Sequence, residues 1–194
     1  MKKSISLALF FFAAAIFYSC EKNDSRFGNR LETTTTTSTE TFNACETAFA
    51  RKTALSHAFC FTQLDLNTDG KPDFNRWGWS NGPLVDSPQM SYYNLYAAAG
   101  QCDPAKGVLV GRMDVQYLNG TVSIVISTIS PYTLDETHLY IGDTVVPVVN
   151  GKATVAPGQY SYSHDLTAAK ADYYTINGVT GSIYLILHAV VCGF

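Results

Sequence analysis

The chain has 194 residues, of which 13 are Lys or Arg and 16 are Asp or Glu, so its formal net charge at pH 7 is −3. A mildly acidic surface keeps a protein soluble and disfavours contact with phosphate groups. The composition therefore argues against nucleic acid as a partner.

The first segment has the pattern of an export signal. Lys2 and Lys3 precede an apolar run over residues 5–17, which is shorter than the roughly 20 residues that a membrane-spanning helix needs. Ser19 and Cys20 follow, and this ending resembles the lipobox of bacterial lipoprotein signals. The resemblance implies a signal peptide over residues 1–19 and fatty acyl chains such as palmitate on Cys20. An ordinary cleaved signal and an uncleaved membrane anchor are the alternatives.

The composition changes abruptly after the signal. Residues 20–41 show no hydrophobic periodicity and include five consecutive threonines at positions 33–37. Such a stretch cannot bury enough apolar surface to fold, which predicts a flexible tether behind the lipidated cysteine. A flexible chain of this length has an end-to-end distance of roughly 25 Å, enough to hold a domain just clear of the lipid.

Residues 42–194 have the length of a single domain and contain four cysteines. An even number of cysteines in an exported chain indicates two disulfides, for which three connectivities exist. We favour Cys45–Cys192, which ties the ends of the domain together, with Cys60–Cys102. A zinc site is the weaker alternative because no two of these cysteines have CxxC spacing.

Strand patterns dominate the domain. Apolar residues alternate over 112–117 and again over 122–126, and Asn119-Gly120 lies between the two runs, which is the strongest short-range hairpin signal. Asn150-Gly151 and Asn177-Gly178 mark further turns, and residues 183–191 are almost continuously apolar, as in a central strand. Only residues 41–55 have a helical pattern. We therefore expect an all-β fold, an antiparallel β-sandwich of about eight to ten short strands stapled by disulfides.

One polar loop resembles the calcium loops of EF-hand and dockerin proteins. Oxygen-bearing side chains stand at alternate positions and Gly70 permits the sharp turn between them, as calcium ligation requires. Arg76 occupies the position where those loops carry a bidentate carboxylate. A structural Ca²⁺ is one interpretation, and a simple Asx-type polar turn is the other. The residues that the resemblance assigns as ligands are Asp65, Asn67, Asp69, Lys71 through its carbonyl, and Asp73.

Both tryptophans lie close together in a short segment. Trp77 and Trp79 are two residues apart, so on a strand they point to the same side. If that side faces solvent, the two indoles with Arg76 and Asn81 form a platform for sugar rings. If it faces inward, they belong to the core, which we expect more often in a domain of this size.

The sequence contains no recognised catalytic motif, and neither a nucleophile elbow, an HExxH zinc motif nor a P-loop is present. His138 lies two residues from Glu136, and His164 lies next to Asp165. A hydrolase using Asp135 and Glu136 with a histidine is a third-ranked hypothesis, because neighbouring residues alternate sides on a strand. We expect a protein that is not an enzyme and that has no catalytic cofactor.

Several short strings over most of the domain resemble an uncharacterised family of exported bacterial surface proteins. These strings are ETAFA at 46–50, RWGW at 76–79 with NG at 81–82, AGQCD at 99–103, ETHLY at 136–140, APGQY at 156–160 and HAVVC at 188–192. With the lipobox, they indicate a lipoprotein on the outer membrane or cell surface of a Gram-negative bacterium. The leading hypothesis is a binding or adhesion module for carbohydrate or a surface protein, and the alternative is a structural envelope or extracellular-matrix protein.

Overall fold

The computed structural model describes residues 44–53 and 57–194, all of which belong to one compact unit, Glu40–Phe194. The expected signal peptide, Cys20 and the threonine-rich tether lie outside the described residues. Within the described part of the chain, no helix is long and apolar enough to cross a membrane.

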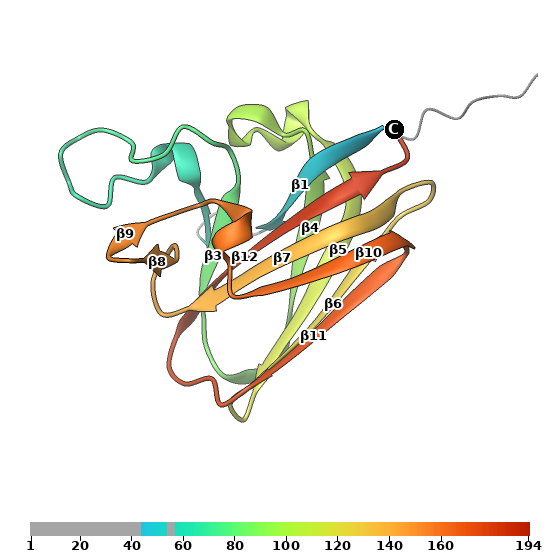
Figure 1. Ribbon diagram of the computed structural model, residues 1–194. Coiled ribbons are helices and arrows are strands. Elements are labelled where there is room, and N and C mark those ends of the chain that lie inside the picture. Colours follow the sequence, from blue (N-terminus) through green and yellow to red (C-terminus); the bar gives the residue numbers. More distant parts are fainter. Residues whose placement is uncertain (1–43, 54–56) are drawn as a thin grey trace, which may run out of the picture. The chain divides into compact units, whose positions relative to one another are not determined.

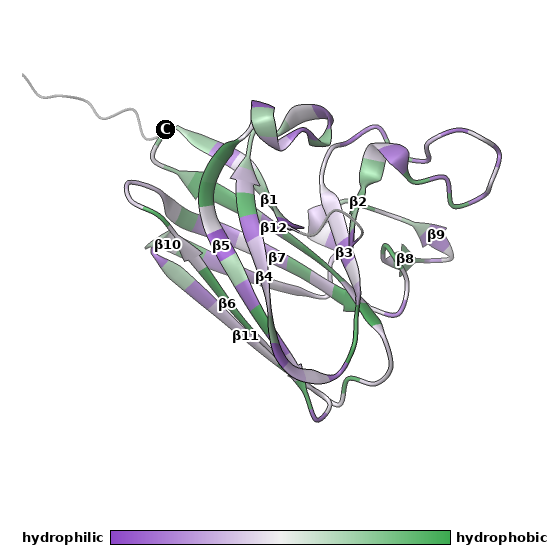
Figure 2. Ribbon diagram, turned by 180° about the vertical axis from the view of Figure 1, so that it is seen from behind, coloured by the Kyte–Doolittle hydropathy of each residue, from purple (hydrophilic) through white to green (hydrophobic). Residues whose placement is uncertain are grey.

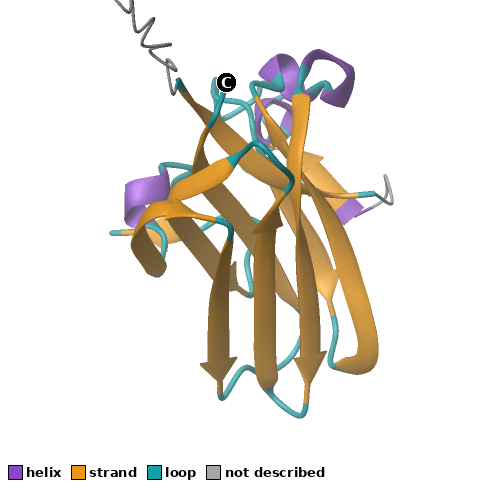
Figure 3. Ribbon diagram, turned by 90° about the vertical axis from the view of Figure 1, so that its right-hand side faces the viewer, coloured by secondary structure: helices purple, strands orange, loops and turns teal. Residues whose placement is uncertain are grey.

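The domain is all-β and antiparallel, as expected. Ten strands form one sheet. Eight of them pair in the order β10-β7-β12-β1-β4-β5-β6-β11, and the other two are attached at β12, where β3 pairs with β12 and β2 pairs with β3. Helical segments are short and lie in the connections between strands (Figure 3). The strands are β1 (Cys45–Lys52), β2 (Ala58–Cys60), β3 (Trp79–Leu84), β4 (Ser87–Ala97), β5 (Val108–Leu118), β6 (Thr121–Thr128), β7 (Thr133–Gly142), β8 (Val148–Val149), β9 (Lys152–Ala153), β10 (Tyr162–Ala169), β11 (Ala171–Asn177) and β12 (Ile183–Cys192). The 3₁₀ turns are η2 (Phe61–Gln63), η3 (Gly100–Cys102), η4 (Pro104–Lys106) and η5 (Pro157–Gln159).

The sheet curls so that its two halves face each other across a core. Hydrophobic and hydrophilic residues alternate along β5 (Figure 2). The alternating apolar residues of β5 and β6 that face this core are buried, namely Val110, Met113, Val115, Tyr117, Val122, Ile124 and Ile126. Asn119 and Gly120 have φ of 52° and 73° and connect β5 to β6 in the expected hairpin. At the far end of the sheet, the Thr137 hydroxyl on β7 donates to Asp172 on β11 at 2.6 Å. This contact brings the curled halves together.

A second core covers the outer face of the sheet. β12 has apolar residues on both sides, because Leu185 and Leu187 lie in the inner core while Ile186 lies in the outer one. Trp79 and Phe61 belong to this outer core, together with residues from the connections after β2 and β7. The almost continuous apolar pattern of residues 183–191 therefore arises from a central strand with both faces covered, as expected.

Both disulfides have the connectivity that we favoured. Cys45 and Cys192 are register partners on β1 and β12 and form one bond, and Cys60 and Cys102 form the other. The helical pattern over residues 41–55 was misleading, since Cys45–Lys52 is strand β1. Pairing with β12 on one side and β4 on the other outweighs the local helical preference of its alanines.

Candidate functional site

A cavity of about 430 Å³ lies on the outer face of the sheet. Its floor is the sheet itself, through β1 and β12, and its walls are the connections that precede β3 and follow β9. Four chain segments that are distant in sequence thus meet there. The lining residues are Thr47, Phe49, Asn75, Arg76, Trp77, Val155, Pro157 and His188.

Ring contacts hold Trp77 at the cavity. Its ring lies 5.2 Å from that of Phe49 and 5.8 Å from that of Trp79, in edge-to-face geometry in both cases. The backbone between the two tryptophans passes directly over the Phe61 ring, and a Cβ on Gly78 would collide with that ring. Gly78 also has φ of +146°, which side-chain-bearing residues rarely adopt, so glycine permits this approach.

Trp79 and Asn81 do not belong to the site, and their assignment as ligand-binding residues is wrong. Trp79 is 2% exposed and packs in the outer core, and Asn81 is fully buried. The Asn81 amide donates to the Ala50 carbonyl at 3.0 Å, and its oxygen accepts the Lys52 N–H at 2.7 Å. Asn81 therefore fastens β3 to β1. Of the four predicted residues, only Arg76 and Trp77 line the cavity.

His188 contributes an unusual polar group to the cavity floor. Its side chain is 7% exposed, and its Nδ1 atom has no hydrogen-bond partner among the described residues. Burial, and secondarily the neighbouring His138, lower the pKa of His188 to about 4, so the ring is neutral at pH 7. Neutral imidazole offers one donor and one acceptor. The sequence signal for this residue was a single polar side chain within the apolar run 183–191.

No family model, curated protein or solved structure matches this chain.

Of the two histidine–carboxylate pairs that are close in the sequence, only His138 and Glu136 are in contact in the structure. His138 Nε2 lies 2.5 Å from Glu136 Oε1, and its ring lies 5.4 Å from that of His188. His164 does not pair with Asp165. Its Nδ1 instead lies 2.9 Å from Asp172 on the neighbouring strand.

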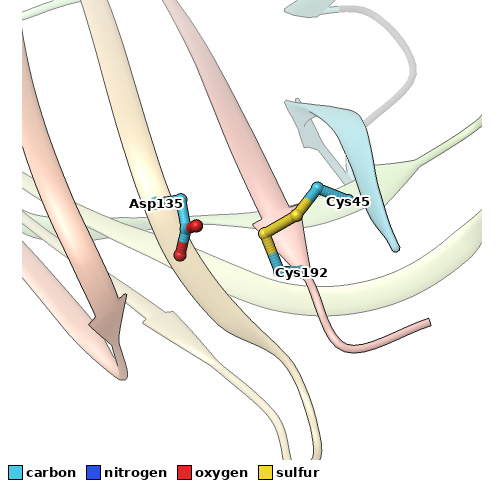
Figure 4. A group of neighbouring side chains, drawn as sticks. All are labelled: Cys45, Asp135 and Cys192. Atoms are coloured by element: carbon cyan, nitrogen blue, oxygen red, sulfur yellow. A yellow bond between two sulfur atoms is a disulfide. The ribbon is translucent and has the colours of Figure 1, made fainter. Parts of the chain in front are cut away.

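The two carboxylates of the hydrolase hypothesis, Asp135 and Glu136, contact different residues and do not share one site. Asp135 Oδ1 accepts the Ala168 N–H at 3.2 Å, while Glu136 contacts His138. Asp135 also lies beside the Cys45–Cys192 disulfide (Figure 4). In the described part of the chain, these three are the only grouped His, Cys, Asp or Glu side chains within reach of one ion. Their sulfurs are bonded to each other, so the cluster lacks the thiolates that bind metals.

The calcium-like loop is organised by its own side chains. Asp65 accepts the N–H groups of Asp69 at 3.1 Å and Gly70 at 2.8 Å. Asp73 accepts the N–H of Leu66 at 2.6 Å and the amide of Asn67 at 3.3 Å. Gly70 has φ of +83°, in agreement with the sharp turn expected there. These Asx-type bonds fit both interpretations of the loop.

Proposed function

We propose that this protein is a surface binding module that holds a carbohydrate residue in the outer cavity. The observation that carries the proposal is the juxtaposition of the Trp77 ring with the side chains of Arg76 and Asn75 around one hollow of about 430 Å³. Small-ligand sites measure about 300–1,000 Å³ and combine apolar walls with a few placed polar groups.

The cavity chemistry suits a sugar. Trp77, Phe49 and Pro157 offer apolar surface to the C–H face of a pyranose ring. Arg76 and Asn75 are exposed at the rim and offer hydrogen bonds to ring hydroxyls. Because His188 is neutral at pH 7, the floor favours an uncharged hydroxyl over a carboxylate or phosphate.

Replacing Trp77 with alanine is expected to abolish most of this binding. An aromatic contact at the centre of a site contributes about 2 kcal/mol or more, so the Kd should rise roughly thirtyfold. Retention of the full-length protein on a panel of immobilised polysaccharides, followed by calorimetry with the retained glycan, provides the measurement. Arg76→Gln, at an exposed position, should weaken the same interaction without affecting folding.

Tyr92→Ala is the matched control, since Tyr92 is 58% exposed and does not line the cavity. Its binding should equal that of the unmodified protein. Absence of saturable retention on every glycan would refute the carbohydrate proposal and leave the structural envelope role. Equal loss in the Trp77 and Tyr92 variants would show that the cavity is not the site.

We further propose that the module is a lipoprotein attached through Cys20 to the outer membrane or cell surface. The two disulfides support an oxidising compartment, and the lipobox-like residues support the attachment. Replacing Cys20 with serine is expected to move the protein from the detergent-extracted membrane fraction to the soluble fraction, because a stable anchor requires the acyl chains. Cell fractionation with immunoblotting checks this, and continued membrane association of the variant would contradict it.

Calcium in the loop is proposed as a structural clip, supported by the calcium-loop-like spacing in the sequence of Asp65, Asn67, Asp69, the Lys71 carbonyl and Asp73. Calcium at about ten times its Kd should stabilise the fold by about 1.4 kcal/mol, which raises Tm by roughly 3–6 °C. Differential scanning calorimetry with calcium and with magnesium measures the effect. Asp73→Asn keeps an acceptor for the Leu66 N–H but removes a charge, and it should eliminate the calcium shift. The same shift in this variant would argue for a plain polar turn.

A further inference from the structure

The two ends of the sheet lie beside each other without pairing. Among the strands of residues 44–53 and 57–194, β10 has β7 as its only partner, and β11 has only β6. The two strands are consecutive in the chain and joined at Lys170, and they diverge from that junction (Figure 1). Each therefore presents backbone N–H and C=O groups that no described strand bonds, although the Tyr173 N–H on β11 already donates to Asp172 Oδ1 at 2.8 Å.

A cavity of about 460 Å³ lies between these two edges. Its lining consists of two runs only, residues 161–164 at the start of β10 and residues 173–176 within β11. Four consecutive residues span about 13 Å of extended chain, so the cavity is as long as a short strand. We call it the seam.

Side chains fix the width of the seam at its closed end. The His164 Nδ1 contacts Asp172 across it at 2.9 Å, and the His164 ring stacks on Tyr174 at 4.3 Å with an interplanar angle of 3°. Asp172 is 6% exposed and also accepts the Thr137 hydroxyl, so its position is determined by three strands. These contacts give the inner side of the seam a fixed arrangement before a guest binds, which lowers the entropy lost on binding.

We propose that the seam binds an extended peptide segment of a partner protein, which inserts as an additional strand between β10 and β11. An extended polypeptide presents N–H and C=O groups alternately on both sides, and this is the complement that two facing strand edges require. The insertion completes the ring of strands that the seam interrupts.

The lining also defines the chemistry of the guest. No Lys or Arg lines the seam, and Asp172 lies behind it, so an acidic segment is disfavoured. Tyr174 and His164 fill the inner side, which leaves room there only for small side chains such as those of Gly, Ala or Ser. The guest is thus a neutral or basic segment with small residues at alternate positions.

The test uses the full-length protein in detergent and, as probe, a displayed library of random linear peptides. Recovered peptides are synthesised in two further forms, with N-methyl groups on the odd residues or on the even residues. Because alternate N–H groups of a strand point to opposite sides, each form blocks one edge. Both forms are expected to weaken binding by about tenfold or more, measured by fluorescence anisotropy.

A protein variant provides the second arm. Thr175→Trp places a large ring in the seam, and Ser123→Trp places the same ring on its register partner in β6, outside it. Peptide binding should be lost in the first variant and kept in the second.

The methylated peptides also distinguish the outcomes. Weaker binding of only one methylated form would show that the peptide adds to a single edge, and unchanged binding of both forms would exclude main-chain recognition. The proposal would also be overturned if no recovered peptide loses binding in Thr175→Trp. It would be overturned equally if this chain forms dimers through the seam and Thr175→Trp dissociates them. Trp77→Ala should leave peptide binding unchanged, so this result is independent of the carbohydrate site.

Discussion

Replacing both Cys45 and Cys192 with alanine is expected to lower the free energy of unfolding by about 5 kcal/mol. The bond closes a loop with a sequence separation of 147 residues, so its loss frees a large part of the unfolded chain. In the chain-entropy model the stabilisation grows with the logarithm of the loop length. The bond also joins register partners on β1 and β12, so its loss leaves the end of the sheet held by hydrogen bonds alone.

Urea unfolding followed by tryptophan fluorescence measures this difference, since Trp79 is buried in the outer core. The double variant Cys60→Ala with Cys102→Ala provides a comparison, because its sequence separation of 42 residues predicts a smaller loss of about 4 kcal/mol. A larger loss in that second variant would show that native-state contacts around η3, and not loop entropy, determine the stabilisation.

The stability of the domain is expected to fall as the pH decreases from about 6.5 to about 4, with a contribution from His188 of about 3 kcal/mol. In the unfolded chain His188 takes up a proton below its ordinary pKa of 6.5, whereas in the folded domain burial prevents this until about pH 4. The unfolded state therefore binds more protons in this window. The contribution is complete above pH 6.5 and is lost progressively below it.

The variant His188→Phe isolates this contribution from those of the carboxylates, which also titrate in acid. Phenylalanine keeps a ring against Phe49, which lies 5.1 Å away, but it takes up no proton. Urea unfolding at a series of pH values should give a shallower acid slope for the variant than for the unmodified protein. Parallel slopes would show that His188 is protonated in the folded domain at the same pH as in the unfolded chain.

Local patterns in the sequence predicted the strands well. The Asn119-Gly120 hairpin follows from the positive φ that these residues tolerate, and the alternation around it determines which side of β5 is buried. The favoured disulfide pairing is confirmed, although the sequence left three connectivities open and only the position of the first and last cysteines at the ends of the domain favoured this one. The helical prediction was wrong for Cys45–Lys52. This segment is a strand because it pairs with β12 and β4, and a local sequence pattern does not contain these distant partners.

The candidate site was less accessible to sequence analysis. The spacing of Trp77 and Trp79 does not show which side of the sheet is covered, and here a second core buries Trp79 while Trp77 reaches a cavity. The floor residues Phe49 and His188 come from opposite ends of the domain. They meet only because β1 pairs with β12, which a pattern within a single segment cannot indicate.

The Cys45–Cys192 bond also determines how the domain carries mechanical force. A pull on the chain before Cys45 enters the sheet at the disulfide and passes at once into the central strand β12. Thr47 and Phe49 lie two and four residues after Cys45 on β1, and His188 lies four residues before Cys192 on β12, so the cavity floor is close to this entry point. In the anchored, ligand-bound state proposed above, tension would pass through the Cys45–Cys192 bond and strands β1 and β12 before it reaches the cavity floor.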